Sequence, residues 1–185
     1  HISSTSTIVY VSRIDTGKGW NVLIDAILEL RLSGDFAGKR VLFVGYGEQA
    51  EMLNEKINDL DLSDCCYYLG PKTHRELSEL YNQADIMIFP TMLYESLGLV
   101  GIEAMACGCP VIGSDIGCLP EYIKEGITGF LFEPGNSHEL AERIVDFYKL
   151  TEKQRNTMRL EAIRYVDKYE SRKISQALIN KIKEI

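Results

Sequence analysis

Two segments of this sequence carry charged residues whose types and spacing suit an anion that also bears hydroxyl groups. The first is RIDTGKG at residues 13–19, which joins two cations to two glycines. Glycine lets a ligand approach the backbone closely, arginine can fork onto phosphate oxygens and lysine adds a point charge. We interpret this loop as a pyrophosphate clamp; the alternative is that Arg13 and Lys18 are solvated surface charges. A Walker P-loop is excluded, because Ser12 stands where a glycine is required and Gly19 replaces the hydroxyl residue after the lysine.

The second segment is YESLGLVGIEAMACGCP at residues 94–110, in which seven residues separate Glu95 from Glu103. Ser96 and Gly98 suit the start of a helix, whose free N–H groups attract an anion. On one straight helix the two glutamates would diverge by roughly 80°, so they suit different parts of one extended ligand. Glutamate accepts hydrogen bonds from paired hydroxyls such as those of a sugar or a ribose. The alternative is that Glu103 is a surface acid of the helix and Glu95 a cap.

A third segment, GYGEQA at residues 45–50, matches the dinucleotide-binding pattern G-x-G-x-x-A. An NAD site also needs an acid at the end of the next strand to hold the ribose, but that strand is followed by Gly-Pro-Lys at residues 70–72. We expect Glu48 and Glu51 in the first turn of the helix, where they would repel a pyrophosphate. These glycines are therefore interpreted as a tight strand-to-helix turn beside a ligand held elsewhere.

The elements that position these segments follow from hydrophobic patterning. Short apolar, β-branched runs predict strands at residues 8–11, 41–44, 66–69, 86–89, 111–112 and 130–132. Three- and four-residue periodicity predicts helices at residues 20–32, 48–60, 75–83, 100–106, 137–148, 152–165 and 172–182. The alternation predicts an α/β fold, a Rossmann-like doubly wound parallel sheet with C-terminal helices. Ligands of such sheets bind beyond the carboxyl ends of the strands, where the charged segments follow.

Composition narrows the function further. A chain of 185 residues with 45% hydrophobic and 25% charged residues can bury one full core, and its net charge of −7 disfavours nucleic acid as a partner. No apolar run approaches the roughly 20 residues of a membrane span, and we find no secretion signal. Five cysteines, an odd number, predict reduced thiols, and their spacing suits no metal. His74 and His138 are expected on the surface, away from the charged segments.

Taken in order, these motifs resemble the C-terminal domain of group 1 glycosyltransferases, the family-four retaining enzymes of the GT-B architecture. The resemblance covers nearly the whole chain. Its anchors are residues 12–14, 18–19, 45–47, 69–70, 84–85, 89–90, 95–100, 103–106, 108–112, 121 and 125–131. Cys118 departs from the pattern, because a second glycine often follows Gly117 in this family.

The resemblance implies that this domain holds a nucleoside diphosphate sugar, such as a GDP- or UDP-sugar, with no metal or other cofactor. The catalytic residues that it implies are Arg13 and Lys18, which neutralise the diphosphate, and Glu95, which binds the sugar hydroxyls. Glu103 would hold the ribose. The donor-binding residues are Arg13, Lys18, Gly70 and Lys72 beside the base, Glu95, Ser96, Gly98, Leu99, Val100 and Glu103.

The resemblance also implies how the chain is used. Residues 1–150 would form the nucleotide-sugar-binding domain and residues 151–185 its C-terminal helices, with Ile174, Leu178 and Ile182 forming an exposed stripe on a segment that crosses to an absent N-terminal, acceptor-binding domain. Together the two domains would act as a cytoplasmic retaining glycosyltransferase of hexosyltransferase type, in polysaccharide or glycoconjugate synthesis. The chain alone is expected to be inactive and not inserted in a membrane, with any contact to the inner membrane face made through the other domain. The alternatives are a GT-B-like epimerase or phosphorylase and a stand-alone nucleotide-binding module.

Overall fold

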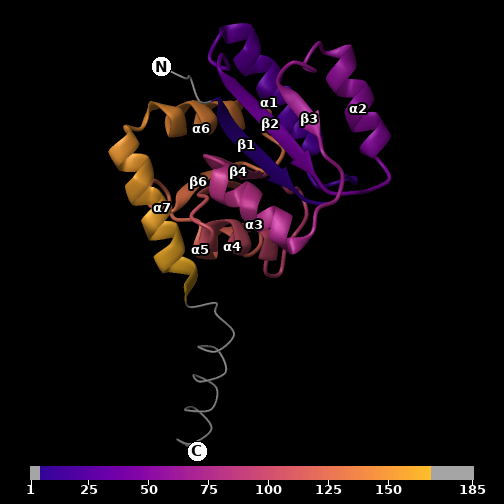
Figure 1. The fold of residues 1–185 in the computed structure, drawn as a ribbon. Helices are drawn as coiled ribbons and strands as arrows, with labels where there is room; N and C mark the ends of the chain where they lie inside the picture. Colours follow the sequence, from indigo (N-terminus) through magenta and orange to yellow (C-terminus); the bar gives the residue numbers. More distant parts are fainter. Residues whose placement is uncertain (1–4, 168–185) are drawn as a thin grey trace, which may run out of the picture.

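A six-stranded parallel sheet lies at the centre of the computed structural model, which describes residues 5–167 (Figure 1). The strands are β1 (Ser6–Val11), β2 (Lys39–Val44), β3 (Cys66–Tyr68), β4 (Ile86–Phe89), β5 (Val111–Ser114) and β6 (Gly129–Phe132). Their order is β3-β2-β1-β4-β5-β6, so the sheet grows in one direction from β1 to β3 and in the other from β4 to β6. Each of these neighbouring pairs is parallel. The predicted doubly wound α/β fold is confirmed.

Helices cover both faces of the sheet. They are α1 (Trp20–Ser33), α2 (Ala50–Asp59), α3 (His74–Gln83), α4 (Leu99–Ala106), α5 (Leu119–Tyr122), α6 (Ser137–Lys149) and α7 (Glu152–Val166). Buried side chains of α1, α2 and α6 pack on one face, and those of α3, α4 and α5 pack on the other (Figure 1). Helix α7 follows α6 and lies against α4.

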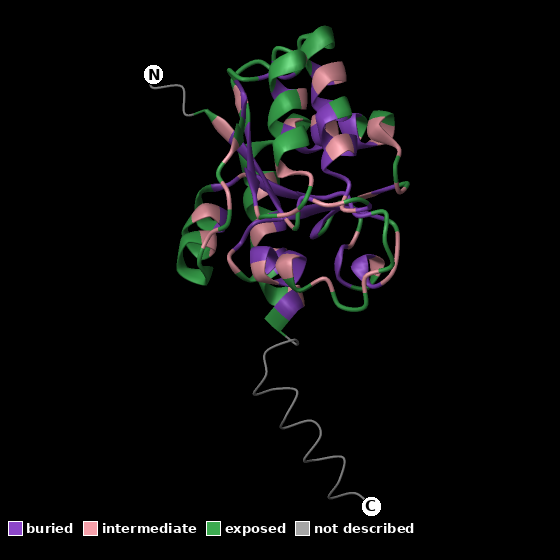
Figure 2. Ribbon diagram, turned by 90° about the vertical axis from the view of Figure 1, so that its right-hand side faces the viewer, coloured by how far each residue is buried: buried purple, intermediate pink, exposed green. Residues whose placement is uncertain are grey.

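The central strand explains why the apolar runs are nearly continuous. In β1, Ile8 and Tyr10 enter the core beneath α1, while Val9 and Val11 enter the core beneath α4 and α5. All four side chains are at most 6% exposed. A parallel strand covered on both faces must be apolar at successive positions, which removes the alternation typical of half-exposed strands. Figure 2 shows this strand layer buried between outer helices whose far faces are exposed.

Two local predictions differ from the structure. Helix α5 is absent from the prediction, because its four residues, with a proline at the start, are too few to show a helical period. Helix α2 begins at Ala50 with Gln49 as its N-cap, so Glu51 lies in its first turn but Glu48 does not. Instead, the backbone N–H of Glu48 donates to the carboxylate of Asp15, 2.8 Å away, and this bond keeps residue 48 in the loop.

Some predictions fall outside the part of the chain that the structure describes. The helix expected at residues 172–182 and the stripe of Ile174, Leu178 and Ile182 lie there, so the division of the chain at residue 150 stays a prediction. Within residues 5–167, no helix is both long enough and apolar enough to cross a membrane.

Candidate functional site

A crevice opens at the carboxyl ends of β1 and β4, where the strand order of the sheet reverses. The loop after β1 lies directly against the loop after β4: the N–H of Met92 donates to the carbonyl oxygen of Gly17 over 2.8 Å. A Cβ atom on Gly19 would stand 1.7 Å from the carbonyl oxygen of Pro90, and Gly19 has a φ of 72°. Only glycine allows this approach, so the glycines of residues 13–19 close one loop onto the other.

A buried tyrosine shapes the loop after β1 from beneath. The hydroxyl of Tyr10 lies 3.1 Å from the carbonyl oxygens of both Arg13 and Lys18, to which it can donate. Burial raises the pKa of Tyr10, so the hydroxyl keeps the proton that it donates. On the outer side, the carboxylate of Asp15 lies 3.2 Å from the guanidinium of Arg13. Sequence reasoning missed Tyr10 because it reads as one more apolar residue of a core strand.

The glycines of residues 45–50 lie against this same loop. A Cβ atom on Gly45 would stand 1.8 Å from the carbonyl oxygen of Ser12, and one on Gly47 would stand 2.3 Å from that of Ile14. The backbone N–H of Gln49 donates to the carbonyl oxygen of Ile14 over 2.9 Å. Their geometry agrees with a tight strand-to-helix turn packed on a neighbouring loop, as interpreted from the sequence.

The start of helix α4 forms the opposite wall of the crevice. Gly98, its N-cap, has a φ of 63° in the left-handed region. The hydroxyl of Tyr122 in α5 donates to the carbonyl oxygen of Gly98 over 3.3 Å, and a Cβ atom on Gly98 or Gly101 would come within 2.7 Å of that hydroxyl. Tyr122 therefore fixes where the free N–H groups of α4 point. Sequence reasoning missed this residue as well, because it belongs to the unpredicted α5.

Glu95 is held through both its backbone and its side chain. The carbonyl oxygen of Glu95 accepts from the N–H of Cys118 over 3.0 Å, and a Cβ atom on Gly117 would lie 2.5 Å from it. The carboxylate oxygen Oε1 lies 2.7 Å from Nζ of Lys18 and 3.1 Å from the hydroxyl of the fully buried Thr91. The backbone φ at Cys118 is −83°, so the departure from the family's second glycine needs no special conformation.

These walls enclose a pocket of about 360 Å³ that gathers most of the predicted site residues. Its lining consists of Ser12, Arg13, Lys18, Phe89, Glu95, Ser96, Leu97, Gly98, Leu99 and Val100. The side chains of Lys18 and Glu95 are 15% and 19% exposed, whereas that of Arg13 is 59% exposed. Two cations and a helix start can attract an anion here, and the carboxylate of Glu95 beside Lys18 can accept hydrogen bonds from hydroxyls.

The remaining predicted residues lie outside that lining. Gly70 is at the same edge of the sheet, where its carbonyl oxygen accepts from the N–H of Gly45 over 3.0 Å. Nζ of Lys72 lies 3.6 Å from a carboxylate oxygen of Glu76 on α3. Glu103 is half-buried on α4, and its charge adds to burial in raising the pKa of Tyr81 on α3. The roles of Gly70, Lys72 and Glu103 stay predictions.

The cysteines and histidines lie apart from the pocket lining. All five cysteines are free thiols, and burial raises the pKa of Cys109 and Cys118. His74 and His138 are exposed, which confirms their expected surface position. Within residues 5–167, no three or more His, Cys, Asp or Glu residues are grouped so that they could hold a metal ion. The absence of a cofactor stays a prediction.

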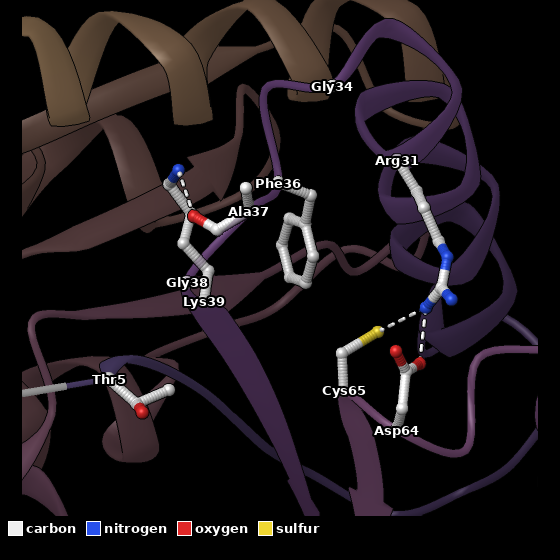
Figure 3. A pocket seen from close by; sticks show the side chains of 9 residues that line it. All are labelled: Thr5, Arg31, Gly34, Phe36, Ala37, Gly38, Lys39, Asp64 and Cys65. Carbon is white, nitrogen blue, oxygen red and sulfur yellow. Dashed lines mark hydrogen bonds and ion pairs between the residues drawn. The ribbon is translucent and has the colours of Figure 1, made fainter. Parts of the chain in front are cut away.

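A second hollow, of about 390 Å³, lies at the opposite edge, by the amino ends of β1, β2 and β3 (Figure 3). It is lined by Thr5, Arg31, Gly34, Phe36, Ala37, Gly38, Lys39, Asp64 and Cys65. Arg31 points toward Asp64, with which it forms an ion pair, and donates to Sγ of Cys65 over 3.3 Å. Lys39 lies across the hollow from Arg31 and donates to the carbonyl oxygen of Ala37 over 3.4 Å. It also donates to the carbonyl oxygen of Asp35 over 2.7 Å. No predicted site residue lines this hollow.

Sequence comparisons show which known proteins this chain is similar to. The family model described as "Glycosyl transferases group 1" matches residues 2–164. The chain is 32% identical over 139 residues to the amylovoran biosynthesis glycosyltransferase AmsK of Erwinia amylovora, covering 72% of this chain and 34% of the relative. It is 30% identical over 153 residues to N-acetyl-alpha-D-glucosaminyl L-malate synthase of Bacillus anthracis, covering 83% of this chain and 39% of that relative. The chain thus spans little more than a third of the length of these relatives.

Solved structures share the fold. The Anabaena protein HepE in complex with UDP-glucose is 26% identical with a TM-score of 0.83, over 97% of this chain and 49% of that one. The C-terminal domain of a group 1 glycosyl transferase from Francisella tularensis, LpcC, is 25% identical with a TM-score of 0.77, over 90% of this chain and 87% of that one. The first similarity covers about half of a longer protein, and the second covers most of a domain crystallised by itself.

Proposed function

The chain belongs to the group 1 glycosyl transferases, and on that basis we propose that it is the donor-binding domain of an enzyme that transfers a sugar, with retention of configuration, from a nucleoside diphosphate sugar to an acceptor. The observation that carries this proposal is the crevice in which Lys18 and Glu95 meet 2.7 Å apart beside the start of α4. A cation and free helix N–H groups suit a diphosphate, and a carboxylate beside them suits sugar hydroxyls.

In this reaction the bond from the anomeric carbon to the diphosphate oxygen breaks, and negative charge gathers on the leaving diphosphate. Arg13, Lys18 and the N–H groups at Gly98, Leu99 and Val100 would stabilise that charge. Tyr10 fixes the backbone at Arg13 and Lys18, and Tyr122 fixes it at Gly98, before the donor binds. The N–H groups at the start of α4 therefore need little reorganisation as the charge develops.

The rest of the donor would extend along the carboxyl edge of the sheet from this crevice. Glu95 would accept hydrogen bonds from the sugar, and Glu103 from the ribose. Gly70 and Lys72, which follow β3, would lie beside the base. The similarity to a protein solved with UDP-glucose supports a nucleotide sugar as the ligand, with UDP and GDP as the first nucleoside diphosphates to test.

An acceptor-binding domain would cover this edge in the whole protein. Exposed apolar side chains surround the crevice, where a solvent-facing surface would favour polar residues. They are Tyr46, Tyr94, Leu97 and Leu99, which are 65%, 80%, 43% and 59% exposed. We propose that the N-terminal half of the enzyme packs here, supplies the acceptor and the other active-site groups, and that residues 1–185 alone do not transfer sugar.

The cellular setting proposed is the cytoplasm, with any contact to the inner membrane face made through the other domain. Five free cysteines, four of them buried, suit a reducing compartment. Synthesis of a polysaccharide or glycoconjugate is the proposed pathway class, supported by the relative named for amylovoran biosynthesis.

Calorimetric titration of the chain with UDP, GDP, ADP, their glucose conjugates and NAD tests the function. We expect one nucleoside diphosphate and its sugar conjugate to bind, with the base identified by the tightest ligand. Binding of NAD in preference to all of the diphosphates would contradict the proposal and favour a dinucleotide-binding module.

A further inference from the structure

The ion pair between Lys18 and Glu95 crosses the crevice from one loop to the other. Lys18 comes from the loop after β1 and Glu95 from the loop after β4, and Nζ lies 2.7 Å from Oε1. Both side chains are largely shielded from water, with exposed fractions of 15% and 19%. Charges at such a site interact more strongly than on an open surface, because less water screens them. A diphosphate that enters the crevice therefore meets a paired cation and a nearby carboxylate, and not a free ammonium group.

The energetic consequence differs between two ligands that share the same diphosphate. A free nucleoside diphosphate must draw Lys18 from Glu95, which leaves a shielded carboxylate without its strongest hydrogen-bond donor. A sugar-bearing donor makes the same demand, but its hydroxyls can donate to Glu95 in place of the ammonium group. An unpaired shielded carboxylate is costly and a hydrogen-bonded one is not. The penalty thus falls mainly on the free diphosphate.

Thr91 explains how the carboxylate keeps its place during this exchange. Its fully buried hydroxyl lies 3.1 Å from Oε1 of Glu95 and accepts from the N–H of Leu93 over 3.2 Å. The same hydroxyl has the carbonyl oxygens of Leu93 and Gly17 at 3.4 Å and 3.5 Å as other acceptors. It has one proton, so it can donate fully to Glu95 when Lys18 turns to a phosphate.

Resting on the function proposed above, we infer that Glu95 makes the site discriminate between the nucleotide sugar and the product, the free nucleoside diphosphate. Its ion pair with Lys18 weakens binding of the free diphosphate relative to the nucleotide sugar. The same pair promotes release of the diphosphate after transfer, because Glu95 takes Lys18 back once the sugar has left. Thr91 is the positioning residue of this exchange.

A double-mutant cycle on the chain tests the inference, with UDP, GDP and ADP as probes and the tightest of them used throughout. Glu95→Gln removes the charge but keeps the size, and is expected to bind the diphosphate about threefold tighter than wild type, the scale of a partly shielded ion pair. Its preference for the glucose conjugate is expected to fall. In the Lys18→Ala background, Glu95→Gln is expected to leave diphosphate affinity unchanged.

The outcomes separate the alternatives. Unchanged or weaker diphosphate binding by Glu95→Gln would overturn the inference, as would equal tightening in the Lys18→Ala background, which would indicate direct repulsion by Glu95. Asp25→Asn is the matched control, because Asp25 pairs with Lys56 at the same 2.7 Å outside the crevice, and its affinities are expected to equal wild type. If the wild-type chain binds none of the three diphosphates, the proposed function itself fails.

Thr91 provides an independent pair of variants whose folding is checked by circular dichroism. Thr91→Val, of the same shape, is expected to bind the diphosphate several-fold more weakly, because Thr91 is the donor that remains to Glu95 when Lys18 turns to a phosphate. It is expected to weaken the glucose conjugate less, because sugar hydroxyls also donate to Glu95. Thr91→Ser is expected to restore the affinity for the diphosphate. Unchanged diphosphate affinity in Thr91→Val, or no rescue by serine, would overturn the positioning role.

Discussion

The two hollows at opposite edges of the sheet have similar volumes, about 360 Å³ at the carboxyl ends and about 390 Å³ at the amino ends, but are built differently. At the carboxyl edge, Lys18 and Glu95 are at most 19% exposed. At the amino edge, Arg31 and Asp64 are 38% and 66% exposed (Figure 3). Volume alone therefore does not identify a binding site. Shielded charges held by buried hydroxyls and close backbones distinguish the carboxyl edge.

Substitution of one glycine at each edge tests this contrast. The largest effect of any substitution is expected here, on the free energy of unfolding. Gly19 and Gly34 both have positive φ, 72° and 87°, so alanine strains the backbone at either position by about 1–2 kcal/mol. A Cβ atom meets the carbonyl oxygen of Pro90 at 1.7 Å in Gly19→Ala but nothing within 4 Å in Gly34→Ala. We expect Gly19→Ala to lower the free energy of unfolding by at least about 2 kcal/mol more than Gly34→Ala does.

Urea unfolding of both variants, followed by circular dichroism, measures this difference. Nucleotide titration of Gly34→Ala is expected to match wild type, because that residue lines the opposite hollow. Equal destabilisation by the two substitutions would show that the loops after β1 and β4 are not packed as closely as described.

A tyrosine hydroxyl that donates to a backbone carbonyl occurs at both edges, and its removal is expected to have a smaller effect, on the affinity for the diphosphate. Tyr122→Phe removes the donor to Gly98 and is expected to weaken diphosphate binding about fivefold, corresponding to about 1 kcal/mol, by loosening the start of α4. Tyr67→Phe removes a donor to the carbonyl oxygen of Asp64, 2.7 Å away on the exposed surface, and is expected to leave nucleotide affinity unchanged. Calorimetry on both variants measures their affinities for the diphosphate. Equal effects of the two substitutions would show that the hydroxyl of Tyr122 has no special role at the carboxyl edge.

The smallest expected effect concerns the ion pair at the amino edge. The hydrogen bond from Arg31 lowers the pKa of Asp64 below its usual value of 3.8, so the pair stabilises the fold above about pH 4 and is lost as the pH falls through the folded pKa. Because both side chains are exposed, Asp64→Asn should cost at most about 0.5 kcal/mol at pH 7 and less under acidic conditions. Thermal unfolding at pH 7 and pH 3 measures it. A destabilisation that grows toward pH 3 would contradict this assignment.

The fold was largely predictable from the sequence, and the reason lies in the strands. Residues 8–11, 41–44 and 86–89 are short apolar runs typical of strands that are covered on both faces, and all three are strands in the structure. Spacing also identified Arg13, Lys18 and Glu95 as charged residues that follow strands. Patterning found these elements because burial acts on every residue of a strand or helix face.

The groups that hold the site were not predictable in the same way. Tyr10, Thr91 and Tyr122 each read as core or loop residues, and each acts through a hydroxyl whose partners include a backbone carbonyl distant in the sequence. A carbonyl has no signature in the sequence, since every residue has one. Only the packed fold shows which hydroxyl reaches which carbonyl. In the same way, the sequence shows that Lys18 and Glu95 each follow a strand, but only the structure shows that their side chains form an ion pair.

In the proposed function, the crevice at the carboxyl edge binds a diphosphate through Lys18. Calorimetric titration of wild type, Lys18→Ala and the surface control Lys56→Ala with UDP, GDP and ADP, and with uridine, guanosine and adenosine, measures this role of Lys18. Lys18→Ala is predicted to lose at least about tenfold in affinity for the diphosphate that wild type binds, with nucleoside affinity unchanged and Lys56→Ala equal to wild type. Equal losses for the diphosphate and its nucleoside would contradict the account.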